Sequence, residues 1–291
     1  MLDVFLALAG MAVAGAGWAV AIEPRLLRVD RRHVASSRWP AHWPPLKLAV
    51  LADLHAARPH VDAARIGRIV ARILAETPDL VLLPGDFVST RARWQRPLSP
   101  DAIAAALAPL TRVPVVATLG NHDYEHGFDL VGRALRAVGI EVLHDSARRM
   151  PWGDGAVHLA GIPYRGSGRF DTRRAFADLD PALPLIVTSH TPDAFPHLPA
   201  EALLTVAGHT HGGQVKLPGL PPPVTFSRLP RRMAHGLHRD GDRFLYVSAG
   251  VGMSGPPIRF GVPPEIGILT VAAATSPTSP APAKRYAGAA R

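Results

Sequence analysis

Residues 46–55 read LKLAVLADLH, a short apolar run that ends in an aspartate and a histidine. Runs this short that are rich in Leu and Val are typical of buried strands. The pattern recurs further along the chain, where apolar runs lead into Gly85-Asp86, Gly120-Asn121-His122-Asp123, Ser189-His190 and Gly208-His209-Thr210-His211. Helical patterns at 62–75, 100–110 and 128–138 lie between the first runs. This strand–helix alternation predicts an α/β fold with a largely parallel sheet.

Each of these strand ends carries a side chain that can bind a metal ion. In open α/β sheets, ligands bind beyond the carboxyl ends of the strands. A single aspartate or histidine there would ordinarily be a helix cap, a turn residue or a surface histidine. Five such ends in one chain favour a shared site instead. The candidate ligands are Asp53, His55, Asp86, Asn121, His190, His209 and His211.

The number and spacing of these side chains indicate a pair of metal ions. Asp53-x-His55 and His209-x-His211 are expected to place two ligands on one side of an extended segment, because side chains alternate with a period of two. One divalent ion usually takes about four protein ligands, so a larger set suggests two ions that share a bridging carboxylate. Ions paired about 3.5–4 Å apart clamp the attacking and leaving oxygens in phosphoryl transfer.

The five blocks, in order between residues 53 and 211, resemble the motifs of the calcineurin-like metallophosphoesterase superfamily. The block GHTHGGQ at 208–214 and the segments EPR at 23–25, IRF at 258–260 and PEI at 264–266 are similar to its membrane-associated YaeI/YkuE-like phosphodiesterase branch. One departure is Ala52, where that branch commonly has serine. Ala52 is not a ligand position, so the metal site is unaffected.

The resemblance implies a four-layer α/β/β/α sandwich with a dinuclear metal centre at its strand ends. It implies one ion held by Asp53, His55 and His211, a second held by Asn121, His190 and His209, and Asp86 as the bridge between them. It also implies a metal-dependent phosphohydrolase, a phosphodiesterase or pyrophosphatase, in which metal-bound hydroxide attacks phosphorus. The two divalent ions would be Mn, Fe, Zn, Co or Ni, which suit oxygen and imidazole donors.

His122 is the candidate catalytic residue that the resemblance leaves free of metal. It follows Asn121 directly, and neighbouring side chains on an extended segment point in different directions. If Asn121 faces the metal, His122 is expected to face the scissile phosphate and to protonate the leaving oxygen. Asp123 is expected either to orient His122 or to hold a turn. Arg58, Arg165 and Arg259 are candidate phosphate contacts, although each is more simply interpreted as a surface arginine.

The N-terminal segment, residues 1–24, is predicted to be a single-pass membrane anchor. Residues 4–22 carry no charge, and a helix of that length spans about 28 Å, close to the hydrocarbon core of a bilayer. A buried core helix and a signal peptide cleaved after Ala21 are the alternatives. Asp3 and the lack of Lys or Arg before the run are unlike a signal peptide. The arginines that follow it predict a cytoplasmic catalytic domain: Arg25, Arg28, Arg31 and Arg32.

The other boundaries follow from composition. Residues 25–45 are predicted to be an irregular linker with Trp39 and Trp43 near the membrane, and residues 46–272 to be the metallophosphoesterase domain. The Ala-, Pro- and Ser-rich residues 273–291 are predicted to be a disordered tail. Less helix separates the apolar runs late in the domain, so part of the sheet is expected to be mixed or antiparallel. The chain has no Cys, which excludes disulfides and thiolate chemistry.

The formal net charge of +9 favours anionic partners. It suits a phosphorylated small molecule, a nucleotide diphosphate or a lipid-linked substrate at a membrane surface, such as UDP-2,3-diacylglucosamine, which enzymes similar to this branch cleave in lipid A biosynthesis. A nuclease or general phosphatase of the same fold is the alternative. Specific nucleic-acid binding is not expected, because aromatic residues make up only 6% and no basic stripe interleaves with them. A non-catalytic scaffold is disfavoured, because every ligand position and His122 are filled.

Overall fold

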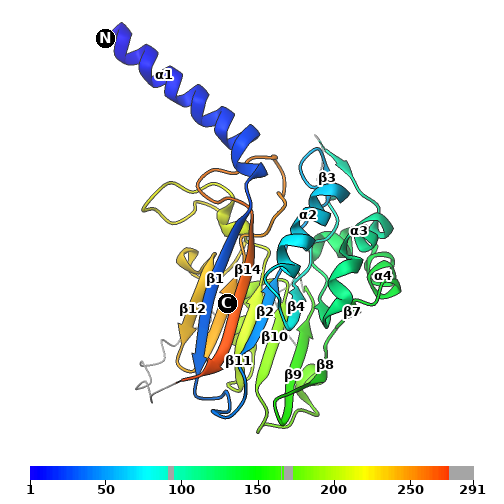
Figure 1. Ribbon diagram of the computed structural model, residues 1–291. Helices are drawn as coiled ribbons and strands as arrows, with labels where there is room; N and C mark the ends of the chain where they lie inside the picture. Colours follow the sequence, from blue (N-terminus) through cyan, green and yellow to red (C-terminus); the bar gives the residue numbers. More distant parts are fainter. Residues whose placement is uncertain (91–94, 165, 167–172, 275–291) are drawn as a thin grey trace.

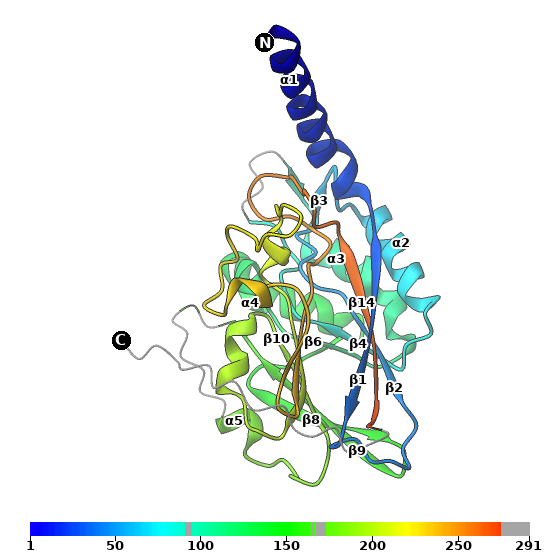
Figure 2. The same cartoon turned by 90° about the vertical axis from the view of Figure 1, so that its left-hand side faces the viewer.

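The computed structural model describes residues 1–90, 95–164, 166 and 173–274. Two six-stranded sheets pack face to face, with strand orders β1-β14-β2-β4-β6-β7 and β12-β13-β11-β10-β9-β8. Helices cover the outer face of each sheet (Figures 1 and 2). The predicted α/β/β/α sandwich is therefore confirmed. Both sheets are mixed, as predicted, because β14 pairs antiparallel with β2, β12 with β13, and β8 with β9.

The first sheet lies under three helices. Its strands are β1 (Arg28–Ser36), β2 (Leu46–Val50), β4 (Leu80–Leu83), β6 (Val115–Ala117), β7 (Glu141–Val142) and β14 (Glu265–Ala273). The helices are α2 (Ala63–Leu74), α3 (Pro100–Leu107) and α4 (Asn121–Ala137). The Asp62 side chain caps α2 by accepting from Arg65 N at 2.8 Å, and Ser99 caps α3 ahead of Pro100. Ile66, Ile69 and Ile73 form the buried face of α2, at the spacing of one helical stripe.

The second sheet completes the sandwich. Its strands are β8 (Ser146–Trp152), β9 (Gly155–Ile162), β10 (Leu185–Ser189), β11 (Ala202–Ala207), β12 (Gly236–Asp240) and β13 (Arg243–Val247). Two short helices, α5 (Arg173–Phe176) and a 3-10 helix at Pro192–His197, belong to the outer layer of this sheet. Apolar side chains from both sheets, such as Leu48 and Leu204, fill the space between them. A small two-stranded antiparallel sheet of β3 (Ala57–Arg58) and β5 (Arg96–Pro97) lies beside the first sheet.

The prediction of an irregular linker at residues 25–45 is wrong. β1 pairs in parallel with β14 along its whole length, from Arg28 opposite Glu265 to Ser36 opposite Ala273. Trp39 and Trp43 are buried beyond the far end of β1, where their rings meet edge to face at 5.7 Å in the core between the sheets. They therefore lie away from the N-terminal helix. The wrong prediction has a physical cause, because β1 is an edge strand whose exposed positions carry charges.

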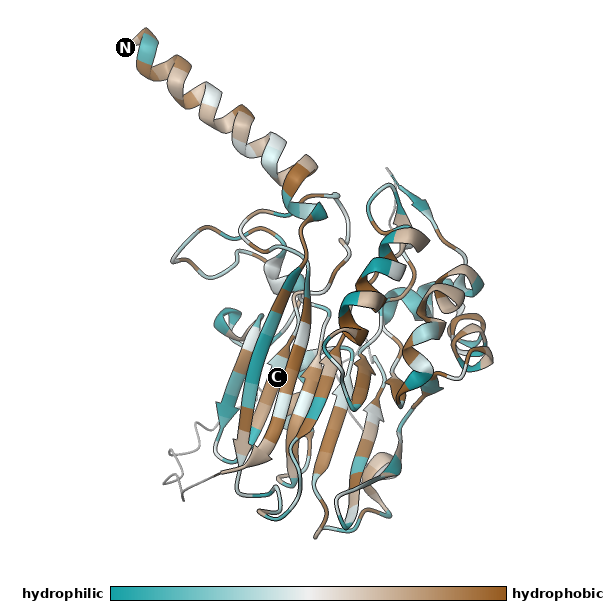
Figure 3. Cartoon of the chain, in the orientation of Figure 1, coloured by the Kyte–Doolittle hydropathy of each residue, from teal (hydrophilic) through white to brown (hydrophobic). Residues whose placement is uncertain are grey.

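The N-terminal helix α1 (Leu2–Gly17) projects from one end of the sandwich (Figure 1). A π-helical turn at Trp18–Ile22 and a 3-10 turn at Glu23–Arg25 continue it, and Leu2–Arg25 is long and apolar enough to cross a membrane (Figure 3). None of the α1 side chains is buried, so a core helix is excluded. At the other end of the chain, β14 reaches Ala273, and residues 275–291 of the predicted tail lie outside the described residues.

The strand register shows at which end of the sandwich β2 and the strands parallel to it finish. Asp30 of β1 lies opposite Gly267 of β14, and Gly267 lies opposite Val50 of β2. β2 runs antiparallel to both, so the chain leaving β2 towards Asp53 lies level with the first residues of β1. β1 begins three residues after the last turn of the N-terminal helix. The carboxyl ends of β2, β4 and β6, which run parallel to one another, therefore meet at the end of the domain that carries α1.

Candidate metal centre

The predicted ligands converge at this end of the sandwich, and both sheets contribute to them. Asp53 and His55 follow β2, Asp86 follows β4, and Asn121 begins α4 just after β6. His190 follows β10, and His209 and His211 follow β11. Asp53, His55, Asp86 and His190 are almost completely buried. Residues as far apart in sequence as 53 and 211 therefore meet at these strand ends.

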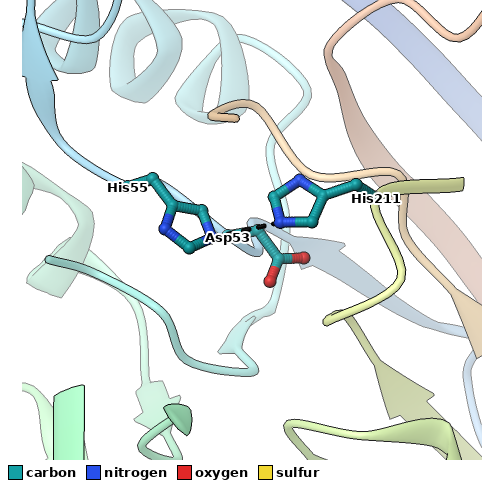
Figure 4. Close-up of side chains that lie close together, drawn as sticks. All are labelled: Asp53, His55 and His211. Atoms are coloured by element: carbon teal, nitrogen blue, oxygen red, sulfur yellow. Dashed lines mark hydrogen bonds between the residues drawn. The ribbon is translucent and has the colours of Figure 1, made fainter. Parts of the chain in front are cut away.

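Asp53, His55 and His211 form the first group of donors (Figure 4). The Nε2 atoms of the two histidines are 3.1 Å apart, and an Asp53 oxygen lies with them in a cluster less than 4.8 Å across. Asp53 also accepts hydrogen bonds from His209 N at 3.0 Å, which fixes its carboxylate. Two imidazole nitrogens and a carboxylate oxygen directed at one point can bind a divalent cation.

His190, Asn121 and His209 form the second group. His190 Nε2 is 3.1 Å from Asn121 Oδ1 and 3.1 Å from His209 Nδ1. The other ring nitrogen of His190 donates a hydrogen bond to the carbonyl oxygen of Pro84 at 2.8 Å. A ring nitrogen held as a donor in this way leaves the opposite nitrogen available as a ligand. Asn121 Oδ1 adds a neutral oxygen donor to the group.

Asp86 lies between the two groups. Its Oδ2 atom is 3.3 Å from His55 Nε2 in the first group and 3.3 Å from His190 Nε2 in the second. Its Oδ1 atom accepts a hydrogen bond from His122 N at 2.9 Å, which orients the carboxylate. One carboxylate oxygen therefore faces both donor groups.

The backbone at the ligands differs from the extended geometry expected from the Asp-x-His and His-x-His spacing. Five of the ligands have a positive φ, between 38° and 70°: Asp53, His55, Asp86, His209 and His211. Each therefore lies in a tight left-handed turn, a conformation that costs energy in non-glycine residues and is typical of functional sites. The turns pack closely, because a Cβ atom on Gly208 would come within 2.4 Å of Asp53 Oδ2 and one on Gly120 within 2.2 Å of Asp86 Oδ1.

Burial and mutual charge shift the pKa values of the cluster strongly. Burial raises the pKa of Asp53 to about 6 and lowers that of His209 to about 4. Burial disfavours the charged form of His190, but the negative charge of Asp86 outweighs it and raises the pKa to about 9. Burial likewise opposes ionisation of Asp86, yet its contacts with His190 and His55 hold its pKa well below the usual value. A bound cation would replace the protons that balance these carboxylates.

His122 lies beside the cluster, but the prediction that Asn121 and His122 belong to an extended segment is wrong. Asn121 and His122 are the first residues of α4, which begins after Gly120, and not part of an extended segment. His122 Nδ1 is 2.5 Å from Thr90 Oγ1, which donates in turn to Glu125 at 2.6 Å. His122 Nε2 is 3.3 Å from Ser254 Oγ. A nitrogen of His122 also lies within 4.8 Å of donor atoms of His55 and Asp86.

Of the two roles that the sequence leaves open for Asp123, the structure supports the turn role. Its buried carboxylate accepts from the backbone N–H groups of Asp86, Phe87, Val88 and Gly120 at 2.8–3.2 Å. These bonds hold the turn that carries Asp86. Thr90 contacts His122 Nδ1, and Glu125 accepts a hydrogen bond from Thr90. Neither residue was predicted from the sequence, because neither follows a predicted strand or belongs to a recognisable motif.

Of the candidate phosphate contacts, neither Arg58 nor Arg259 is among the residues that line the cleft at the metal centre. Arg259 is fully buried and donates to backbone carbonyl oxygens within residues 249–262. Burial lowers the pKa of its guanidinium to about 10, so it stays charged at neutral pH. Arg58 is exposed on β3, and Arg165 lies outside the described residues.

A cleft of about 580 Å³ opens over the metal centre. Asp86, Asn121, His122, His209 and His211 line its base. Its walls include apolar side chains from two loops, among them Val215, Val224, Phe226 and Ile258. The cleft therefore combines a polar, metal-binding base with an apolar wall.

Comparison with known proteins agrees with this geometry. Residues 46–213 match the family described as calcineurin-like phosphoesterase. Phosphodiesterase YaeI of Escherichia coli (strain K12) is 33% identical over 230 residues, which cover 77% of this chain and 82% of YaeI. An uncharacterized metallophosphoesterase of Bacillus subtilis (strain 168), YkuE, is 26% identical over 90% of this chain and 92% of its own length. UDP-2,3-diacylglucosamine pyrophosphatase LpxG of Chlamydia trachomatis is 28% identical over 87% of this chain and 91% of its own length.

Proposed function

Because the chain belongs to the calcineurin-like phosphoesterase family and is therefore a metal-dependent phosphoester hydrolase, we propose that it cleaves a phosphodiester or pyrophosphate bond in a lipid-linked substrate. The proposal includes a dinuclear centre with Asp86 as its bridge. The observation that supports the dinuclear centre is the position of Asp86 Oδ2, which is 3.3 Å from a histidine nitrogen of each donor group.

The donor set suits two divalent ions. Asp53, His55 and His211 would hold one ion, Asn121, His190 and His209 would hold the other, and Asp86 would contact both. Two ions bound there would supply Lewis acidity to an attacking water and to the phosphoryl oxygens. The protein's own contribution is to fix these donors in strained turns before a substrate arrives, so that little reorganisation is needed during the reaction.

His122 is the proposed proton donor to the leaving oxygen. Thr90 Oγ1 donates to Glu125, so it accepts a hydrogen bond from the Nδ1–H group of His122. With Nδ1 held as a donor, a second proton on this ring is carried by Nε2. His122 lines the base of the cleft, where Nε2 can deliver that proton to a departing alkoxide. The Glu125 carboxylate lies 3.8 Å from Nδ1, on the side of the ring away from Nε2.

A panel of substrates tests the proposed activity. We expect the full-length chain, purified in detergent, to contain close to two transition-metal ions. We also expect it to hydrolyse bis-p-nitrophenyl phosphate and UDP-2,3-diacylglucosamine, and to lose both activities after chelation. Cleavage of single-stranded DNA without cleavage of the lipid-linked pyrophosphate would favour a nuclease. Native metal with no activity on any of the three would favour a scaffold.

The N-terminal helix is proposed to be a retained anchor and not a cleaved signal. Residues on both sides of the possible cleavage point after Ala21 bond to one another and to the catalytic domain. Ala19 O accepts from Arg259 N at 3.0 Å, and Trp18 Nε1 donates to Glu23 at 2.7 Å. The buried Glu23 carboxylate also accepts from Val262 N at 2.6 Å. Cleavage would remove the contact of Ala19 with Arg259 and the contact of Trp18 with Glu23.

The topology prediction is that the catalytic domain faces the cytoplasm, because the arginines follow the apolar helix. We expect the protein to pellet with membranes at full length. Protease added to spheroplasts should leave residues 46–272 intact and should degrade them after permeabilisation. A mature N-terminus at Ile22 in mass spectrometry, or digestion in intact spheroplasts, would contradict this topology.

A further inference from the structure

The loop at residues 215–226 exposes an unusual group of large apolar side chains. Its members are Leu217 (55% exposed), Leu220 (57%), Val224 (50%) and Phe226 (77%). Among the described residues that follow Leu26 in the sequence, the other exposed large apolar side chains are Phe128 (42%) and Leu130 (51%) on α4. Soluble surfaces rarely gather such side chains, and an apolar patch of this kind marks an interaction site.

A continuous set of backbone hydrogen bonds ties this loop to the proposed anchor. Ala19 O in the N-terminal helix accepts from Arg259 N at 3.0 Å. The next residue, Phe260, donates to Gln214 O at 3.1 Å and accepts from Lys216 N at 2.8 Å, so Val215 and Phe260 form a parallel bridge. The segment at residues 259–260 therefore connects the helix with the start of the loop through backbone hydrogen bonds. The helix and the loop lie at the same end of the domain (Figures 1 and 2).

The base of the helix is fixed to the domain. The Arg65 guanidinium donates to the carbonyl oxygens of Pro24, Arg25 and Leu26 at 2.9–3.0 Å. β1 starts at Arg28, so only two residues separate the last helical turn from the sheet. Because this connection is short and hydrogen-bonded, an anchored domain is expected to keep the 215–226 loop at the level of the membrane surface.

Charge completes the pattern. The segment at residues 212–235 contains Lys216, Arg228, Arg231 and Arg232 and no Asp or Glu. The three arginines are exposed and follow the apolar loop directly. Apolar side chains flanked by basic ones are typical of segments that lie in the interface of an anionic bilayer. A protein partner would need acidic groups around an apolar socket, whereas an anionic bilayer offers both features over its whole surface.

We propose that the loop at residues 215–226 is a second membrane contact, in which Leu217, Leu220, Val224 and Phe226 enter the interface of an anionic bilayer. The inference rests on the membrane anchor proposed above. It has a consequence for the substrate, because Val224 and Phe226 also line the cleft over the metal centre. The cleft would then open at the bilayer interface, and a phosphoester headgroup would reach the metals while its acyl chains stay in the membrane.

Fluorescence quenching in vesicles tests the contact directly. The chain has no Cys, so Leu220→Cys gives a single labelling position on the full-length protein. Leu130→Cys is the matched control, because Leu130 is similarly exposed (51%) but lies on α4. With an environment-sensitive dye in phosphatidylcholine–phosphatidylglycerol vesicles, we expect the Leu220 label to shift to the blue. Lipids with quenchers on their acyl chains should quench it several-fold more than the Leu130 label.

The outcomes separate the loop contact from the anchor. Equal quenching of the two labels, with both proteins still floating with the vesicles, would refute the loop contact and leave the anchor intact. Failure of both proteins to float would overturn the anchor and this inference together. A Leu220 label that is protected without lipid quenching, in a protein that runs as a dimer in detergent, would assign the loop to a second copy of the chain instead.

A double variant, Leu217→Ser with Leu220→Ser, adds a functional readout, because neither side chain lines the metal cleft. We expect hydrolysis of water-soluble bis-p-nitrophenyl phosphate to be unchanged and hydrolysis of a lipid-linked pyrophosphate in vesicles to fall several-fold. If the variant matched the parent on the lipid-linked substrate as well as on the soluble one, the membrane contact would be contradicted. If the parent does not cleave the lipid substrate at all, the proposed substrate class fails, and the quenching result alone decides the loop contact.

Discussion

Replacing Asp86 by alanine is expected to abolish hydrolysis and to lower bound metal from two ions per chain towards one or none. Asp86 Oδ2 is 3.3 Å from His55 Nε2 and 3.3 Å from His190 Nε2, so this carboxylate faces both donor groups. Its loss would remove negative charge from between the two proposed cations, where their mutual repulsion is greatest. Inductively coupled plasma mass spectrometry and the rate on bis-p-nitrophenyl phosphate measure the two effects.

Two further variants give this test its controls. Asp86→Asn keeps the size of the side chain and an oxygen that can accept from His122 N, but it removes the charge. We expect it to fold and still to lose metal. Asp79→Ala removes an aspartate that accepts from Lys47 N at the opposite end of β2, and it should keep both metals and activity. Full metal loading with a parental rate in Asp86→Ala would contradict the dinuclear assignment.

The strand ends could be predicted from the sequence because their physical signal is local. β2, β4, β10 and β11 are buried on both faces, so each is a nearly unbroken apolar run, and the polar residue that follows is conspicuous. The same logic fails for β1, whose sequence RVDRRHVAS has few apolar residues. β1 is an edge strand, and the buried Asp30 within it pairs with Arg32 and the Tyr246 hydroxyl. Those contacts exist only after folding.

The left-handed turns at the ligands and the long-range contacts could not be predicted from local sequence patterns either. Nothing in Asp53-x-His55 signals a positive φ at both residues, because that geometry depends on bonds from Asp53 N to Gly85 O and from His55 N to Asp86 O. Arg259 looks like any other arginine in the sequence, yet its guanidinium is enclosed by carbonyl groups. The carbonyl groups that surround Arg259 can be identified only in the folded structure.

His122→Asn is expected to keep both metals and to lose about 10²–10⁴-fold in rate on alkyl phosphodiesters, the usual range for general acid catalysis. An alkoxide leaves only with a proton, and His122 lines the base of the cleft with its Nδ1 atom held by Thr90. A p-nitrophenolate departs without a proton, so the same variant should lose much less on p-nitrophenyl esters. Rates on the two substrates, measured at matched metal content, give the ratio that tests this role.

Metal content decides between the remaining roles of His122, because its ring lies close to the proposed ligands. The His122 and His55 ring centroids are 4.6 Å apart, and a His122 nitrogen clusters with donor atoms of His55 and Asp86. A fall in bound metal in His122→Asn would make His122 a ligand. Equal losses on alkyl and p-nitrophenyl substrates at full metal content would reduce it to a positive charge that binds the phosphate. Only a leaving-group-dependent loss at full metal content matches a proton donor, because proton transfer is the one role of His122 that the leaving group can make unnecessary.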